Sequence, residues 1–117
     1  MNFKILGTGS YVPDNVVTND DLSKIVETSD EWISKRVGIK ERHISVTDTT
    51  LDMGANAAAE ALKDSGVDAK ELDLIITATI SSDTACPSLA CLIQNRIGAE
   101  CMAFDISAAC AGFLFAL

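Results

Sequence analysis

Predicted helices alternate with apolar segments of strand length in the second half of the chain. A capping signal at Thr49 opens a helix that is predicted to run to about Ser65, and a second helix is predicted over residues 88–97. Each is followed by an apolar run, at residues 72–79 and 101–106. The first run lacks the alternation of apolar and polar side chains, which is typical of a strand covered on both faces. This order of elements predicts a layered α/β fold.

The N-terminal residues 3–8 are predicted to form another strand that leads into a glycine-containing turn. The turn has the beginning of a dinucleotide-binding pattern, but Val12 stands where the third glycine belongs, and a loop follows where the phosphate-binding helix should begin. We therefore interpret this turn as structural. The helix that follows Thr49 carries small residues on its inward face, which would let another backbone approach it closely: Gly54, Ala57, Ala58 and Ala61.

Two short helices are predicted between these regions. The first follows the capping signal at residues 18–21 and carries Leu22, Ile25 and Val26 at helical spacing. The second is predicted to open with a capping box at residues 28–31 and to end at a glycine, Gly38. An extended segment or short strand is expected to follow it, up to Ile44.

The second short helix carries a candidate nucleotide-binding pair, Trp32 and Arg36. The two residues are four positions apart, so they share one face of the helix. An indole beside a guanidinium suits an adenine ring and its phosphates, although a half-buried tryptophan covered by an arginine stem is the alternative. Four of the nine basic residues lie within eight positions of this acidic chain and indicate either an anion-binding patch or a solvated face: Lys35, Arg36, Lys40 and Arg42.

A candidate nucleophile, Cys110, lies among small residues after the last predicted strand and before an apolar run, residues 113–117, that can begin a buried helix. A cysteine at such a turn lies near the unpaired N–H groups of the first helical turn, and this setting favours the reactive thiolate. Its small neighbours leave room for an acyl group to approach the sulfur. The alternative is that Cys110 is a tightly packed core residue.

The composition argues against several classes of function. The net charge of −8 argues against binding to nucleic-acid phosphates, and no apolar run approaches the about 20 residues that span a bilayer. The N-terminus turns polar too soon for a secretory signal, so the four cysteines predict reduced thiols in a cytoplasmic protein. No C-x-x-C pair accompanies the single histidine, His43, which argues against a structural zinc site and favours a structural or surface role for His43.

Taken together, these segments resemble the N-terminal part of β-ketoacyl-(acyl carrier protein) synthase III, a family of the thiolase superfamily. The strongest match is Asp-Ile-Ser-Ala-Ala-Cys-Ala-Gly-Phe at residues 105–113. The other matching segments are Gly-Thr-Gly-Ser-Tyr at 7–11, Thr-Ser-Asp-Glu-Trp-Ile at 28–33, Gly-Ile-Lys-Glu-Arg-His at 38–43 and Pro-Ser at 87–88. The resemblance implies that residues 1–117 form the N-terminal half of a layered thiolase-like domain, in which helices pack on a central mixed sheet.

The resemblance also implies a role for each candidate residue. Cys110 would take an acyl group from a short acyl-CoA, and decarboxylation of malonyl-acyl carrier protein would supply the carbanion that converts this acyl group into a 3-oxoacyl product. Trp32 and Arg36 would bind CoA, with Thr28 as a further contact. Cys86 stands where some relatives carry a bulky aromatic that reaches the primer pocket across the dimer, so a smaller side chain could admit longer or branched primers. An ordinary loop cysteine is the alternative for Cys86.

No cofactor or metal is expected, because acyl-CoA is a substrate. The family is considerably longer than this chain, and its catalytic histidine and asparagine lie in the part that residues 1–117 do not include. We therefore expect this chain to be a fragment that is inactive by itself, and the complete protein to be a homodimer. Two alternatives are a related synthase of the same superfamily that uses other acyl-CoA primers, and a non-catalytic interaction domain whose cysteines are core residues.

Overall fold

A computed structural model describes residues 3–117. The chain divides into two compact units, one formed by Val12–Asp48 and the other by the residues up to Tyr11 together with Thr49–Leu117. In the described residues, no helix is both long enough and apolar enough to cross a membrane.

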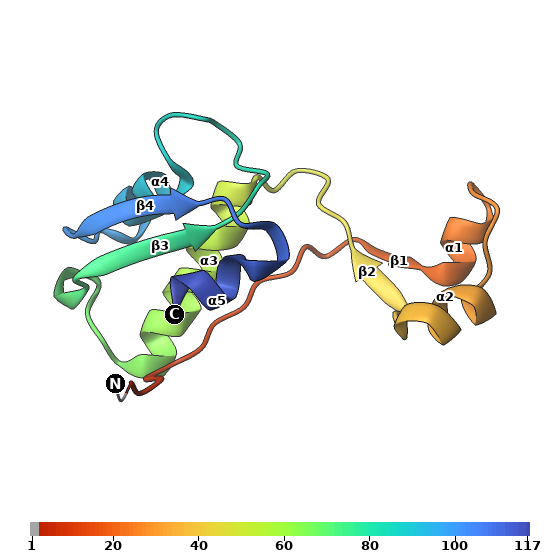
Figure 1. Cartoon of the computed structure of the whole chain (residues 1–117), viewed down its shortest axis with the longest axis horizontal. Helices are drawn as coiled ribbons and strands as arrows, with labels where there is room; N and C mark the ends of the chain where they lie inside the picture. The colour runs from red at the N-terminus through yellow and green to blue at the C-terminus, as the bar shows by residue number, and fades with distance from the viewer. Residues whose placement is uncertain (1–2) are drawn as a thin grey trace. The chain divides into compact units, whose positions relative to one another are not determined.

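The unit Val12–Asp48 is a small antiparallel strand pair with two short helices. Its elements are β1 (Val16–Thr18), α1 (Asn19–Ser23), α2 (Asp30–Val37) and β2 (Glu41–His43). Strands β1 and β2 pair with Val17 opposite Arg42, and α1 contacts α2 (Figure 1). The strand that we expected between Gly38 and Ile44 is therefore confirmed, and it is short.

A buried asparagine, Asn19, holds this unit together. Its side chain is 1 % exposed and donates hydrogen bonds to Asp30 Oδ1 and to the carbonyl of Ile39, both at 2.8 Å. Its own oxygen accepts a bond of 2.6 Å from Arg42 Nη2, whose other terminal nitrogen donates to the carbonyl of Val17. Because a buried amide is stable only when it is hydrogen-bonded, this network fixes the start of α2 against β2.

The predicted helices of this unit are confirmed, with two corrections. The capping signal at Thr18 forms a reciprocal capping box with Asp21, but α1 ends at Ser23 and leaves Ile25 and Val26 exposed outside it. The cap of α2 is Ser29 rather than Thr28: its hydroxyl accepts from the backbone of Trp32 at 3.1 Å. A helix this short has few apolar contacts to extend it, which accounts for the early end of α1.

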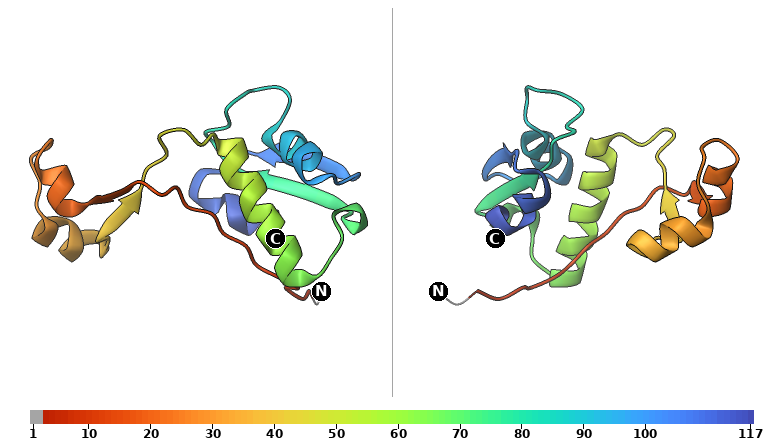
Figure 2. Two further views of the ribbon diagram at one scale, coloured as in Figure 1. Left: turned by 180° about the vertical axis from the view of Figure 1, so that it is seen from behind. Right: turned by 45° about the vertical axis from the view of Figure 1, so that its right-hand side comes forward.

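The second unit contains a parallel strand pair with helices packed on it. Helix α3 (Thr50–Ser65) and a short 3₁₀ turn η1 (Ala69–Glu71) precede β3 (Leu74–Ala78), and α4 (Leu89–Ile97) leads to β4 (Met102–Ile106). A second 3₁₀ turn, η2 (Ala109–Ala111), and α5 (Gly112–Ala116) follow β4. In Figure 1, α5 lies toward the viewer and α3 lies behind the strands. In the left view of Figure 2, which is seen from behind, α3 lies in front. This is the predicted alternation of helices and strands.

The core of this unit lies where α3, α4 and the strand pair meet. Its buried apolar residues include Ala55 of α3 and Leu89, Ala90 and Ile93 of α4. The side chain of Ile93 lies directly over Gly54, where a Cβ would come within 2.7 Å of its Cδ1 atom. The helix ends are as predicted, because α2, α3 and α4 each end at a glycine with positive φ: Gly38, Gly66 and Gly98.

The N-terminal segment, residues 3–8, is not the strand that we predicted. It pairs with neither sheet among the described residues, and Ile5 and Leu6 are exposed, because the strand pair β3–β4 has no further strand within this chain. The segment instead lies against α3. A Cβ on Gly9 would lie 2.2 Å from the carbonyl oxygen of Ala57 and 2.3 Å from the nitrogen of Ala61. The structural interpretation of the glycine turn is thus confirmed.

The last helix, α5, is not buried as predicted. Its large apolar side chains are exposed in this chain: Phe113, Leu114 and Phe115, followed by Leu117. Only Gly112 is buried in this helix, where its Cβ position lies 3.0 Å from Cβ of Ala78 in β3. The described residues supply no second layer over α5, which is the reason that an apolar helix stays open to solvent.

Candidate active site

The candidate nucleophile, Cys110, lies in the 3₁₀ turn η2 between β4 and α5. It is a free and exposed cysteine, so the alternative of a buried core residue does not hold in this structure. The preceding residue, Ala109, has a φ of 44°, a left-handed conformation that is unfavourable for a residue with a Cβ. Such strain often marks functional turns, and here it lies directly before the sulfur-bearing residue.

The helix after this turn begins two residues beyond Cys110. Helix α5 starts at Gly112 and is five residues long, with no side-chain cap at its N-terminus. The prediction of a strand-to-helix turn with Cys110 before the helix is therefore confirmed. Gly112 lies close to Ala78 at the end of β3, because a Cβ at position 112 would be 3.0 Å from Cβ of Ala78, a tight contact.

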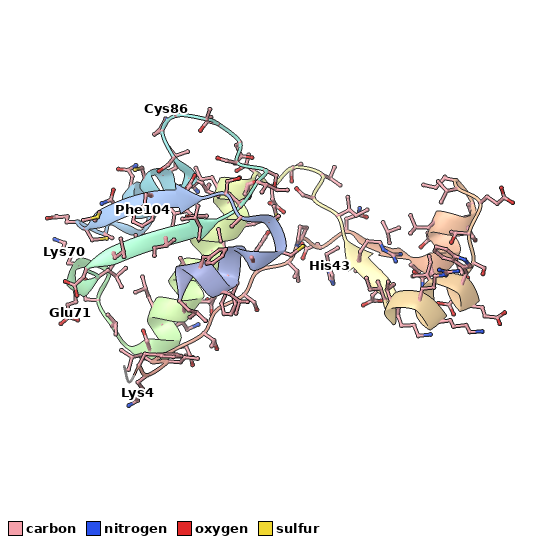
Figure 3. All side chains as sticks on the ribbon, in the orientation of Figure 1. Lys4, His43, Lys70, Glu71, Cys86 and Phe104 are labelled. Atoms are coloured by element: carbon pink, nitrogen blue, oxygen red, sulfur yellow. The ribbon has the colours of Figure 1, made fainter. Side chains whose placement is uncertain are left out.

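The loop that carries Cys86 leaves the strand pair at the same edge as the Cys110 turn. Strands β3 and β4 are parallel, with Ala78 opposite Ile106, so the segments that follow them emerge together at their carboxyl ends. Cys86 is free and exposed on the loop between β3 and α4 (Figure 3). The structure therefore brings the loops of the two candidate residues to one edge of one sheet.

An aspartate in this loop, Asp83, binds the beginning of α3. Its two carboxylate oxygens accept hydrogen bonds from the backbone nitrogens of Thr50, at 3.1 Å, and Leu51, at 2.9 Å. These two N–H donors hold the pKa of Asp83 below its ordinary value of 3.8. Sequence reasoning missed this residue, because nothing in a polar loop identifies a partner more than 30 positions away.

A second carboxylate, Asp105 of β4, binds the beginning of α4 in the same way. Its oxygens accept hydrogen bonds of 2.7 Å from the backbone nitrogens of Leu89 and Ala90. Asp105 thereby connects the helix after the Cys86 loop to the strand before Cys110. The sequence did carry a signal for this contact, since Asp105 is a lone carboxylate inside an otherwise apolar strand. A charge withdrawn from water in such a strand needs hydrogen-bond donors.

The predicted nucleotide-binding pair lies in the other unit, on α2. The guanidinium carbon of Arg36 lies 4.9 Å from the centre of the Trp32 ring, so the predicted shared face is confirmed. Trp32 is 56 % exposed, and the Arg36 guanidinium lies over its ring. This arrangement fits both the predicted nucleotide-binding pair and the alternative of a half-buried tryptophan covered by an arginine, so both stay predictions.

Thr28 lies beside Trp32 with an unsatisfied hydroxyl. Its Oγ1 atom is buried and has no hydrogen-bond partner in the structure. A surface hollow of about 450 Å³ is lined by residues 27–29 and Trp32. A buried hydroxyl without a partner costs free energy, so this atom is suited to a polar group that enters the hollow.

The predicted anion-binding patch separates into two parts. Arg42 is used within the Asn19 network, and Lys40 lies 3.0 Å from Ser34 Oγ and 3.7 Å from Asp30 Oδ2. Lys35 and Arg36 remain exposed on α2, at its C-terminal turn. Arg42 therefore serves the internal contacts of this unit, whereas Lys35, Arg36 and Lys40 stay exposed. The two interpretations, an anion-binding patch and a solvated face, both stay predictions.

His43 lies on β2, exposed, and its Nδ1 donates a hydrogen bond of 2.6 Å to the carbonyl of Pro13 (Figure 3). This contact agrees with the structural or surface role predicted for it. Within residues 3–117, the histidine, cysteine and acidic side chains form no group of three that could hold a metal ion.

Comparisons with known proteins show which proteins this chain is similar to. No protein-family model matches the chain. The chain is 59 % identical over 115 residues to the curated β-ketoacyl-(acyl carrier protein) synthase III of Clostridium acetobutylicum, covering 97 % of this chain and 35 % of the relative. A Clostridium botulinum protein of the same name is 53 % identical over 117 residues, covering 99 % of this chain and 36 % of the relative.

Solved structures agree with these relatives. The crystal structure of 3-oxoacyl-(acyl carrier protein) synthase III from Aquifex aeolicus matches with a TM-score of 0.93 at 54 % identity, over 97 % of this chain and 37 % of that one. The priming β-ketosynthase of a polyketide biosynthetic pathway matches with a TM-score of 0.88 at 38 % identity, over 97 % and 34 %. The fold is thus that of a thiolase-like α/β condensing enzyme.

Within this class, the sequence identities confirm the predicted resemblance. The chain matches the N-terminal part of proteins named β-ketoacyl-(acyl carrier protein) synthase III. It spans about a third of the length of the curated relatives that it matches, so it contains less than the N-terminal half that we expected.

Proposed function

We propose that this chain supplies the nucleophile and the CoA-binding helix of a β-ketoacyl-(acyl carrier protein) synthase III. The observation that carries this proposal is the exposed Cys110 in a strained strand-to-helix turn, within a sequence that is 59 % identical to a synthase of that name. The term "full-length protein" denotes a protein of the relatives' length whose N-terminal part is this chain.

The proposed reaction has two stages. The Cys110 thiolate attacks the thioester carbonyl of a short acyl-CoA, and the tetrahedral intermediate collapses to release the CoA thiolate and leave an acyl-enzyme. Malonyl-acyl carrier protein then loses carbon dioxide, and its carbanion attacks the acyl-enzyme. The carbon–sulfur bond to Cys110 breaks, which returns the thiolate and gives a 3-oxoacyl-acyl carrier protein. We propose the backbone N–H of Cys110 as one donor to the oxyanion.

We propose that helix α2 binds the nucleotide part of CoA. The open Trp32 ring supplies a surface for the adenine, and the adjacent Arg36 supplies a cation for its phosphates. The unpaired hydroxyl of Thr28 supports a third contact in the hollow beside the ring. These residues and Cys110 belong to different units of this chain, so the proposal concerns each group separately.

We propose that the loop that carries Cys86 determines which acyl-CoA primers are accepted. Cys86 is free and exposed on this loop, which supports the implied role of this position, a side chain that reaches the primer pocket across the dimer. A cysteine in place of a bulky aromatic would favour longer or branched acyl groups. The structural match to a polyketide priming β-ketosynthase supports the second candidate, a related synthase with other acyl-CoA primers.

We further propose that the complete synthase is a cytoplasmic homodimer without a cofactor, and that residues 1–117 alone do not complete the condensation. The family resemblance places the catalytic histidine and asparagine outside these residues. The open face of α5 supports the same view, because residues 3–117 leave its apolar side chains exposed.

The test is intact-mass analysis of the full-length protein after incubation with acetyl-CoA, followed by peptide mapping. We expect an added acetyl group on the peptide that contains Cys110, and we expect Cys110→Ala to lose it. Cys91→Ala is the matched control, because Cys91 lies on α4 with its Sγ 3.6 Å from the carbonyl of Ala103. An absence of adduct with acetyl-CoA and with longer or branched acyl-CoAs would contradict the enzyme proposal and favour a non-catalytic interaction domain.

A further inference from the structure

One buried residue, Asn19, is attached to helix α2 at both of its ends. At the start of the helix, its Nδ2 atom donates a hydrogen bond of 2.8 Å to Asp30 Oδ1. Just beyond the end of the helix, the same atom donates to the carbonyl of Ile39 at 2.8 Å, and the backbone N–H of Asn19 donates to the carbonyl of Lys40 at 3.3 Å. A single residue therefore fixes both the start of α2 and the segment that follows it.

The surroundings of Asn19 allow its amide one orientation. Its oxygen accepts from Arg42 Nη2 at 2.6 Å and its nitrogen donates to two acceptors, so a flipped amide would direct an oxygen at the carboxylate of Asp30. The side chain is 1 % exposed, so water cannot readily replace these hydrogen bonds. The network is therefore a rigid support for the helix.

The predicted nucleotide-binding pair lies between the two attachments. Trp32 is two residues after Asp30, and Arg36 is three residues before Ile39. Helix α2 contributes one buried residue, Ile33, so apolar packing holds only one turn of it. The direction in which α2 presents Trp32 and Arg36 therefore depends on the polar attachments at its two ends.

We propose that Asn19 is a positioning residue that holds Trp32 and Arg36 in place for the nucleotide of CoA and thereby determines how strongly the protein prefers a CoA thioester to a thioester without a nucleotide. This inference rests on the proposed function and concerns its choice of acyl donor. Asn19 is buried and acts through α2, without a contact to CoA.

The first test compares Asn19→Asp with Asn15→Asp in the full-length protein. An aspartate at position 19 keeps an oxygen for Arg42 but has no N–H group to donate, so it releases both Asp30 and the carbonyl of Ile39. Asn15 is an exposed asparagine of the same unit, and its substitution makes the same change in charge.

The measured quantity is the second-order rate constant for acylation of Cys110, followed by intact mass. The two acyl donors are acetyl-CoA and acetyl-pantetheine, which has the same thioester and no nucleotide. We expect Asn19→Asp to lower the rate constant with acetyl-CoA by about 10-fold or more, the effect of one lost hydrogen bond to a charged group. The rate constant with acetyl-pantetheine should stay unchanged, and Asn15→Asp should change neither.

Two further variants separate positioning from a general loss of structure. Asp30→Ala removes only the attachment at the start of α2, and we expect it to cause a smaller loss with acetyl-CoA and none with acetyl-pantetheine. This variant also serves if Asn19→Asp fails to fold. If Asn19 acts through α2, the effect of Asn19→Asp with acetyl-CoA should shrink when Trp32 is already alanine.

Two results would overturn the inference while leaving the acyl-enzyme intact. Equal losses with the two thioesters would show that Asn19 only maintains the structure, and an unchanged rate constant with acetyl-CoA would show that it does not position the pair. Failure of the unsubstituted protein to acylate Cys110 with acetyl-CoA and with longer or branched acyl-CoAs is a different result, because it overturns the proposed function and this inference with it.

Discussion

At the scale of single residues, Gly9 lies directly against the backbone of helix α3. A Cβ at position 9 would come within 2.2 Å of the carbonyl oxygen of Ala57 and 2.3 Å of the nitrogen of Ala61, and a helix backbone cannot move aside. We expect Gly9→Ala to lower the free energy of unfolding of the full-length protein by about 1–3 kcal/mol, the usual cost of overpacking. Urea-induced unfolding measures this loss.

The control for this prediction is Gly54→Ala, where the obstacle is the flexible end of a side chain. The added Cβ at position 54 would meet Cδ1 of Ile93, which can rotate, and alanine gains about 1 kcal/mol over glycine inside a helix. We expect the stability of Gly54→Ala to stay within about 1 kcal/mol of the wild type. Equal losses in the two variants would show that the backbone contact at Gly9 is not decisive.

Residue roles were predictable from sequence only where their partners are near in the chain. The small face of α3 and the structural role of the glycine turn could be inferred, because small residues at helical spacing have one main use, close approach. Asp83 and Asp105 were missed, since their partners lie 32 or 33 and 15 or 16 positions away. Such pairs are set by the tertiary fold, which local patterns do not encode.

At the scale of elements, helix α4 depends on Asp105 for two of its N-terminal hydrogen bonds. The donors belong to Leu89 and Ala90, which are 2 % and 0 % exposed, so water cannot replace the carboxylate easily. We expect Asp105→Ala to lower the free energy of unfolding by about 2–4 kcal/mol, because it leaves two buried N–H groups without acceptors.

Measurement of Asp105→Ala by urea unfolding should be paired with Ser88→Ala. Ser88 caps the same helix through a single bond of 3.3 Å to Cys91 N, and we expect its loss to cost about 1 kcal/mol. A loss in Asp105→Ala no greater than that in Ser88→Ala would contradict the role assigned to the distant carboxylate.

Elements were predicted correctly where capping residues and glycines mark both ends. Thr49 and Gly66 bound α3, and Ser88 and Gly98 bound α4, as the sequence indicated. Residues 3–8 failed as a strand because an apolar segment needs a neighbouring strand, and α5 failed as a buried helix because it needs a covering layer. Apolar character shows that a segment can be buried, but it does not show that the chain holds the partner.

At the scale of the whole molecule, four aspartates determine how the chain responds to acid. The pKa values of Asp21, Asp30, Asp52 and Asp83 are all lowered, because the folded state gives each carboxylate hydrogen bonds. The principal donors are the Lys24 ammonium for Asp21, the Asn19 amide for Asp30, the Thr49 hydroxyl for Asp52 and the Leu51 backbone for Asp83. The folded chain therefore binds fewer protons in acid than the unfolded chain.

The sign of the pH dependence follows from this difference. A carboxylate whose pKa is lowered in the folded state stabilises the fold fully when the pH is above 3.8, its ordinary pKa. This stabilisation is lost as the pH falls through the pKa that the group has in the folded state. We expect the melting temperature of the full-length protein to fall as the pH is lowered from about 5 to about 2. Asp52→Asn should show a shallower fall, because asparagine has no proton to take up. Identical slopes in the wild type and Asp52→Asn would show that this hydrogen-bonded cap does not contribute to the acid sensitivity.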